Sequence, residues 1–272
     1  MEKQRSSTDH HVHRILAIWA LLALLPAIGE AATPVNISKA DAVHIGKRIW
    51  QNECNGTIAG LTSWNSGEDF ASLGIGHFIW YPKGMRGPFE ESFPQFLEFA
   101  RQRNATVPVW LNQATFCPWS SRAEFSSAQN SAPMRELRQF LAETVDLQAQ
   151  FLIARLQGAL PKMLAEAPSS EREAVEQNFH RVASSAAGRY ALVDYVNFKG
   201  EGVLPTERYK DEGWGLLQVL SEMRAAEPDT VKEFSRAASA ILRRRVANSP
   251  PERHEAKWLP GWLNRVNSYS RG

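Results

Sequence analysis

The sequence has almost no excess of charge of either sign. Its 31 Lys and Arg residues are matched by 29 Asp and Glu residues, which leaves a formal net charge of +2 at pH 7. Proteins that attract nucleic acids through bulk electrostatics carry a clear basic excess, which this chain lacks. We therefore expect no nucleic acid as a partner, and function has to be sought in a local site.

Several catalytic sequence motifs are also missing. The chain contains no Gly-x-Ser-x-Gly elbow, no Gly-Lys-Ser/Thr phosphate loop, no dinucleotide fingerprint and no His-Glu-x-x-His helix. These absences argue against the corresponding hydrolase, nucleotide-dependent and metalloprotease chemistries. Two cysteines without a matching histidine cluster also argue against a zinc site. We expect neither a metal nor an organic cofactor.

Long hydrophobic runs are absent after the first thirty residues. Three basic residues, Lys3, Arg5 and Arg14, precede the apolar run over 15–28, and small residues follow at Gly29 and Ala31. This pattern is typical of a secretory signal peptide, so residues 1–31 are predicted to be removed and the protein to be periplasmic or secreted. The alternative is an uncleaved anchor, since the run is only somewhat short for a membrane span. After cleavage, no stable membrane span is expected.

Cysteine is scarce. An exported chain meets an oxidising compartment, where the single pair Cys54 and Cys117 is able to close. We therefore treat the pair as a disulfide candidate. The alternative is two buried thiols without a partner.

Hydrophobic periodicity predicts one mainly α-helical domain over residues 32–272, with a small β-hairpin near its start. Ser38 and Asp41 resemble a helix start, and apolar residues then recur at helical spacing towards Cys54. Glycine-rich, β-branched and aromatic residues over 55–81 predict a hairpin or meander. Further helices are predicted after Ser92, after Ser121, from Met134 to an interruption at Pro161, after Ser170, and over 190–198, 214–223, 231–246 and 258–269.

The stretch from Glu53 to His77 is the best candidate for a catalytic site. Glu53 ends a predicted helix, and the polar hairpin that follows carries Glu68 and Asp69. Glycoside hydrolysis needs one protonated carboxyl to donate to the leaving oxygen and a second group to stabilise the cation or activate water. A Glu packed among apolar groups favours the proton-bearing form, whereas a carboxylate on a wet hairpin stays ionised. The order of these residues therefore predicts a pair of glycosidase carboxylates.

The same stretch resembles the phage-type lysozymes. In that family a catalytic Glu at the end of the first helix is followed by a hairpin and a Thr-x-Gly-x-Gly-His segment. Here the segment reads Ser72-Leu-Gly-Ile-Gly-His77. The resemblance implies a lysozyme-like α+β fold, Glu53 as general acid, and Ser72 in place of the Thr that helps to hold the attacking water. Because the hairpin is longer than in the family, either Glu68 or Asp69 matches its Asp.

A second, shorter run over 213–220 is similar to a segment of soluble lytic transglycosylases. That likeness implies that Gln218 hydrogen-bonds a sugar and that Trp214 offers a stacking face, although the apolar residues around them also suit a helical core. His77 orients the catalytic Glu or is simply a packed imidazole. Glu201, in a polar loop between helices, is either exposed to solvent or completes the sugar-binding cleft.

The sequence therefore predicts an exported glycoside hydrolase that cleaves β-1,4 bonds of peptidoglycan or a related amino-sugar polymer, and a monomer. The alternatives are a lytic transglycosylase, a chitosanase-like hydrolase, and a non-catalytic glycan-binding envelope protein of the same fold. A small α-rich inhibitor or adaptor is a further alternative.

Overall fold

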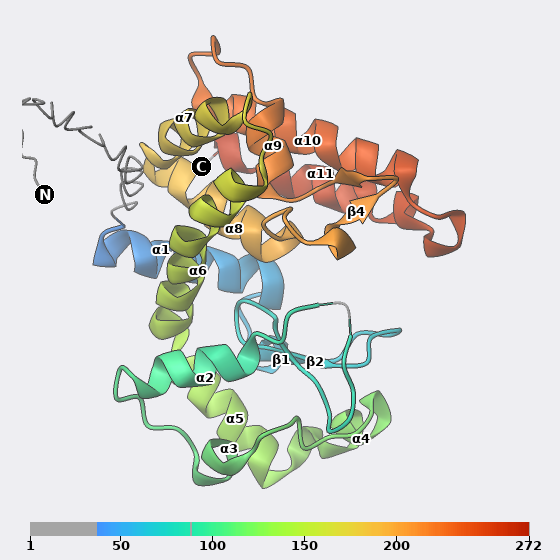
Figure 1. Ribbon diagram of the computed structural model, residues 1–272. Helices are drawn as coiled ribbons and strands as arrows, with labels where there is room; N and C mark the ends of the chain where they lie inside the picture. The colour runs from blue at the N-terminus through green and yellow to red at the C-terminus, as the bar shows by residue number, and fades with distance from the viewer. Residues whose placement is uncertain (1–36, 88, 272) are drawn as a thin grey trace, which may run out of the picture. The chain divides into compact units, whose positions relative to one another are not determined.

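A computed structural model describes residues 37–87 and 89–271, which all belong to one compact unit, Thr33–Gly272 (Figure 1). The described residues form eleven α-helices and two small antiparallel sheets. The predicted fold class, mainly α with a small β part near the start, is confirmed. The predicted signal peptide, 1–31, lies outside the described residues. No helix in the described part of the chain is long and apolar enough to cross a membrane.

The first helix and the first sheet form as the sequence predicts. Helix α1 (Lys39–Cys54) begins where the Ser38 hydroxyl accepts a hydrogen bond from the backbone N–H of Asp41. It ends at Asn55, which adopts the left-handed conformation (φ 51°) that Asn tolerates better than most residues. The three-stranded sheet follows, in the order β1 (Thr62–Ser63), β2 (Ala71–Leu73) and β3 (Phe78–Trp80). Ser72, in the middle strand, pairs with Ser63 on one side and Ile79 on the other.

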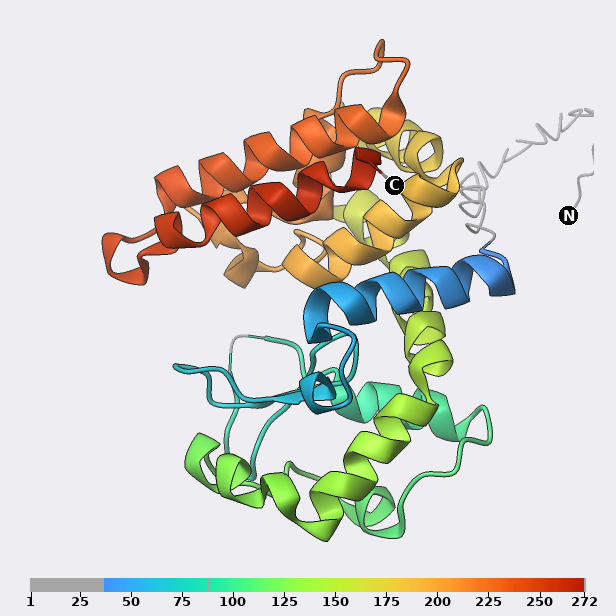
Figure 2. The same cartoon turned by 180° about the vertical axis from the view of Figure 1, so that it is seen from behind.

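The helices that follow lie on the same side of the molecule as this sheet (Figures 1 and 2). They are α2 (Phe93–Arg101), α3 (Val109–Gln113), α4 (Arg122–Ser127) and α5 (Ala132–Glu143). Ser121 caps α4 by accepting a hydrogen bond from the N–H of Glu124, as predicted. The core between α2, the sheet and α6 is aromatic: Phe78 stacks on Phe96, and Phe151 meets both rings.

The long apolar stretch after Met134 differs from the prediction in two ways. The structure divides it at Thr144 into α5 and α6 (Val145–Glu166), because the Thr144 hydroxyl donates to the Phe140 carbonyl and its backbone leaves the helical region. Pro161 lies inside α6 and does not end it. Helix α6 runs from the elements packed near the sheet to the helices that follow it, and α1 packs across it (Figure 2).

The remaining helices are α7 (Arg172–Ala183), α8 (Ala186–Lys199), α9 (Leu216–Glu222), α10 (Thr230–Asn248) and α11 (Leu259–Asn267). Helices α10 and α11 lie side by side (Figure 2). The loop between α8 and α9 contains a small hairpin, β4 (Arg208–Tyr209) and β5 (Glu212–Gly213), which the sequence analysis missed. Short 3-10 turns occur at Ala59–Leu61, Ala128–Asn130, Pro205–Glu207, Pro251–Arg253, Glu255–Lys257 and Tyr269–Arg271.

The disulfide prediction is wrong in this structure: Cys54 and Cys117 are both free and buried. Cys54 ends α1, with its thiol 3.7 Å from the carbonyl oxygen of Gly74, whereas Cys117 pairs through its backbone with Tyr81 and Pro82 beyond β3. Burial is the main cause that raises the pKa of each thiol to about 12. Each sulfur therefore occupies a separate apolar environment as a neutral thiol.

Candidate active site

Glu53 lies at the last turn of α1 with its side chain 13% exposed. The C-terminal end of the helix, followed at once by Asn55 and Gly56 in left-handed conformations, turns the chain towards the sheet. The carboxylate lies against α11, where it accepts a hydrogen bond from the guanidinium of Arg265. Its other oxygen is 3.7 Å from Nδ1 of His77. The apolar surroundings expected for Glu53 are therefore replaced by two basic side chains.

Arg265 is held in place by a second, fully buried carboxylate. Its Nε and one terminal nitrogen each donate to an oxygen of Asp194 on α8 at 2.8 Å, and the same terminal nitrogen also contacts Glu53. Tyr269 donates its hydroxyl to Asp194 at 2.6 Å. Burial by itself lowers the pKa of Arg265, but the charges of Asp194 and Glu53 outweigh it and hold that pKa well above its ordinary value. Arg265 is thus a fixed cation shared by two carboxylates.

His77 reaches Glu53 because of a tight turn between β2 and β3. His77 itself has φ 48°, an uncommon conformation for a residue with a side chain. Glycine is required just before it: a Cβ at Gly74 would lie 2.3 Å from the Gln148 amide oxygen, and one at Gly76 would lie 2.3 Å from the ring of Phe78. These contacts explain the two glycines of the Gly-x-Gly-His segment.

The side-chain amide of Gln148, on α6, holds this turn in place. Its side-chain oxygen accepts the backbone N–H of Ile75 at 2.8 Å, and its side-chain nitrogen donates to the Leu141 carbonyl at 2.6 Å. The amide is fully buried, so the cost of burying it is offset by these bonds. The turn that carries His77 is therefore tied directly to the longest helix.

The two candidates for the second carboxylate occupy different environments. Glu68 is half-buried: Asn65 donates to its carboxylate at 3.0 Å, and the indole of Trp64 donates to its backbone carbonyl at 2.7 Å. Burial raises the pKa of Glu68, while the hydrogen bond from Asn65 and the charge of His77 act in the opposite direction. Asp69 is exposed. His77 therefore lies within electrostatic reach of both Glu53 and Glu68.

Ser72 is only 3% exposed in the middle strand. Its backbone carbonyl accepts the Ser63 hydroxyl at 3.3 Å. The Gly-x-Gly-His segment thus begins at a buried position, and the proposed role of the Ser72 hydroxyl towards water remains a prediction.

The residues predicted to form a sugar-binding wall are engaged elsewhere. Trp214 is 6% exposed, with the ring of Tyr209 at 4.5 Å and the guanidinium of Arg245 at 4.0 Å from its centre, so it offers no free stacking platform. Gln218 accepts the N–H of Gly215 and donates to the carbonyl of Gly202, which ties two loop segments together. Glu201 forms an ion pair with Lys162 at 2.9 Å. Each of these three side chains therefore has partners within the protein, and their roles at a sugar stay predictions.

A buried lysine lies near Arg265. The ammonium nitrogen of Lys199, at the end of α8, is 3.4 Å from the centre of the Trp262 ring and 3.9 Å from that of Phe198. Burial, followed by the charge of Arg245, lowers the pKa of Lys199 well below its ordinary value, and the charge of Glu53 is among the groups that oppose this. Lys199 is therefore a buried amine that is shifted towards its neutral form.

The sequence analysis did not find Arg265, Asp194, Tyr269, Lys199 or Gln148. Asp194 alone had a local signal, because it interrupts an otherwise apolar helix and a buried carboxylate needs a partner. Arg265 had none, since its contact with Glu53 joins residues 212 positions apart.

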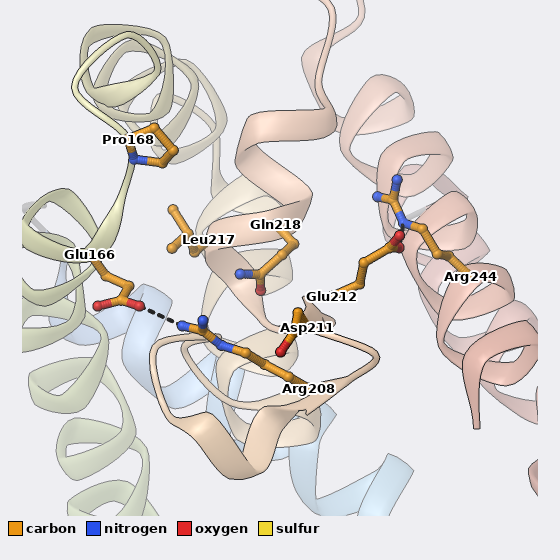
Figure 3. A pocket seen from close by; sticks show the side chains of 9 residues that line it. Glu166, Pro168, Arg208, Asp211, Glu212, Leu217, Gln218 and Arg244 are labelled. Atoms are coloured by element: carbon orange, nitrogen blue, oxygen red, sulfur yellow. Dashed lines mark hydrogen bonds and ion pairs between the residues drawn. The ribbon is translucent and has the colours of Figure 1, made fainter. Parts of the chain in front are cut away.

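No group of three or more His, Cys, Asp or Glu residues in the described ranges is arranged to hold a metal ion. A cavity of about 370 Å³ lies apart from the Glu53 cluster, and Gln218 is the sole predicted site residue in its lining (Figure 3). No protein-family model, curated protein or solved structure matches this chain.

Proposed function

We propose that this chain is a lysozyme-like glycoside hydrolase that cleaves β-1,4 bonds of an amino-sugar polymer, with peptidoglycan as the favoured substrate. The proposal depends on one observation: a carboxylate oxygen of Glu53, at a helix end, lies 3.7 Å from Nδ1 of His77, which lies in the turn after the segment that carries Glu68. Two carboxyl groups in unlike environments are what acid-assisted glycoside cleavage requires.

In this proposal Glu53 gives its proton to the leaving oxygen, and Glu68 stabilises the cation or activates water. Donation requires the contact between Glu53 and Arg265 to open, because the Arg265 guanidinium occupies one oxygen of the Glu53 carboxyl group. Arg265 is able to release Glu53 and keep a partner, since both of its bonds to Asp194 persist. The second role falls to Glu68 ahead of Asp69 because Glu68 is half-buried and its carboxylate is held by Asn65, whereas Asp69 is exposed.

The test is digestion of purified sacculi by the mature protein and by Glu53→Gln, with mass spectrometry of the soluble products. Glutamine keeps an oxygen for Arg265, but its amide is far too weak an acid to protonate the leaving oxygen, so we expect release to fall about 10²–10⁴-fold. Glu136→Gln, at an exposed position of α5, is the matched control and should release fragments like the wild type.

The products distinguish the remaining possibilities. Reducing ends support hydrolysis, and anhydro ends identify a lytic transglycosylase, in which a hydroxyl of the glycan itself closes on the cation. If sacculi bind equally to wild type and Glu53→Gln and neither releases fragments, the chain is a glycan-binding protein and the catalytic proposal is wrong.

We also propose that the protein is exported after removal of residues 1–31. The support is the basic, apolar and small-residue pattern of that segment. Mass spectrometry of the protein from the periplasm or medium should give a chain beginning near Ala32. An intact N-terminus in the membrane fraction would contradict cleavage.

A further inference from the structure

The cavity away from Glu53 is built from five elements of the chain. Its nine lining residues come from the end of α6 and the loop after it, the β4–β5 hairpin, α9 and α10 (Figure 3). They are Glu166, Pro168, Arg208, Asp211, Glu212, Gly213, Leu217, Gln218 and Arg244. At about 370 Å³ the cavity is at the small end of the range of about 300–1,000 Å³ typical of ligand pockets.

The charges in this cavity do not cancel. Arg208 is paired with Glu166, and Arg244 is paired with Glu212 at 3.2 Å and with Glu222 outside the lining at 3.3 Å. The third lining carboxylate, Asp211, forms no ion pair or hydrogen bond within residues 37–87 and 89–271. The cavity therefore has one exposed carboxylate without a basic partner among the described residues.

The backbone at Asp211 is held in an unfavourable conformation that brings this carboxylate to the cavity. Lys210 (φ 50°) and Asp211 (φ 64°) form the two-residue turn between β4 and β5. Such turns favour Asn-Gly or Asp-Gly because both central residues need positive φ. Figure 3 places the Asp211 carboxylate below the Gln218 amide, between the two arginine pairs.

The cavity has an apolar part of its lining and a polar side chain, Gln218, whose position is fixed by hydrogen bonds. Leu217 and Pro168 supply aliphatic surface. Gln218 is fixed because its amide is bonded to both Gly215 and Gly202. A ligand with a short aliphatic chain and a terminal positive charge matches these surfaces, since the chain would lie along Leu217 and the charge would meet Asp211.

We propose that this cavity binds the primary ammonium group of a lysine-type side chain, with Asp211 as the anionic partner. Two features favour such a side chain over an anion: the lining group without a basic partner is a carboxylate, and both guanidinium groups already have carboxylate partners. The proposal concerns a site separate from Glu53 and stands whether or not the chain cleaves a glycan.

The test is titration of the full chain with Nα-acetyl-lysine N-methylamide, followed by NMR or calorimetry. We expect saturable binding that weakens with added salt, because ion pairing at an exposed site is screened. Asp211→Asn should weaken it at least about tenfold, the effect of losing one charge-assisted hydrogen bond. Asparagine is tolerated at positive φ, so this variant keeps the turn.

The controls separate the ammonium group from other causes of binding. Asp146→Asn, at an exposed position near the start of α6, should bind like the wild type. Nα-acetyl-norleucine N-methylamide, which lacks the ammonium, should bind at least tenfold more weakly, whereas n-butylamine, which keeps the aliphatic chain and the ammonium, should bind much as the lysine derivative does. Equal binding of the norleucine and lysine derivatives would overturn the ammonium assignment.

Absence of saturable binding, or equal affinity of the wild type and Asp211→Asn, would overturn the site itself. Glu53→Gln should bind the lysine derivative unchanged. If Glu53→Gln loses sacculus cleavage but still binds the lysine derivative, the two sites are independent. If the wild type binds the lysine derivative but cleaves no glycan, the glycosidase proposal fails and this one stands.

Discussion

Single side chains in the candidate site have environments that set their protonation in opposite directions. Burial raises the pKa of Glu68, and the hydrogen bond from Asn65 partly reverses this. Burial also lowers the pKa of Lys199. In each case the fold disfavours the charged form, and one substitution measures the effect.

Asn65→Ala removes the side-chain donor to Glu68, so the pKa of Glu68 should rise further. If Glu68 must be ionised for cleavage, the acid limb of kcat/KM moves to higher pH, which a pH profile of glycan release measures. Ser66→Ala, at the next exposed position of the same turn, should leave the limb in place. If the acid limb stays at the same pH in Asn65→Ala, the ionised carboxylate is not Glu68, and its role in cleavage would be assigned to Asp69 instead.

Lys199→Met tests the buried amine. The unfolded chain binds a proton at this lysine up to its ordinary pKa, whereas the folded chain releases it at lower pH. Wild-type stability should therefore rise with pH between the lowered and the ordinary pKa, and the penalty is largest below that window. The methionine variant lacks this dependence. Urea unfolding of both proteins from pH 6 to pH 10 should give a difference in unfolding free energy that shrinks as pH rises; a constant difference would show that Lys199 is charged when folded.

At the level of elements, helix α6 supports the turn that carries His77. The buried Gln148 joins Ile75 in the turn to Leu141 at the end of α5, across the break at Thr144. Neither end of this link has a local sequence signal, because a glutamine in a helix is usually exposed.

Gln148→Ala removes both hydrogen bonds and leaves a cavity, so the free energy of unfolding should fall by about 2–4 kcal/mol. The backbone N–H of Ile75 should exchange with solvent faster than in the wild type, which hydrogen exchange by NMR detects. Gln139→Ala, on the exposed face of α5, should change stability by less than about 0.5 kcal/mol. Unchanged exchange at Ile75 would contradict the link.

Much of the element pattern was predictable because it is encoded locally. Ser38 and Ser121 mark helix starts through their own hydroxyls, and glycine spacing marks the turn before His77. The end of α5 was not predictable, since the apolar periodicity of the sequence continues through Thr144. Pro161 was misread as a stop because sequence alone does not show that packing tolerates a missing hydrogen bond inside α6.

At the scale of the whole molecule, the site depends on contacts between distant segments. Glu53 and His77 were found from the sequence because they lie on one continuous stretch. Arg265 and Asp194 come from α11 and α8, and the side chains predicted for the sugar wall are used to join loops. The polar network behind a site is set by tertiary packing, which local patterns do not encode.

The two thiols give a test of the whole fold. Cys54 and Cys117 are buried with raised pKa values, so a thiol reagent at pH 8 should react with neither in the native protein and with both in denaturant. Added reductant should not change the melting temperature. Fewer than two reactive thiols in denaturant without reductant would mean that a disulfide has formed after all.

The ion pair between Glu53 and Arg265 spans 212 positions of the chain and closes on the last α-helix. During synthesis, α1 and the Gly-x-Gly-His turn leave the ribosome long before α11 exists. For most of that time Glu53 lacks its hydrogen bond from Arg265, and Asp194 lacks its bonds from both Arg265 and Tyr269. The nascent polypeptide therefore cannot assemble its complete polar centre until translation is nearly finished. A product that ends before Leu259 would carry the Gly-x-Gly-His segment but would lack Arg265 and Tyr269.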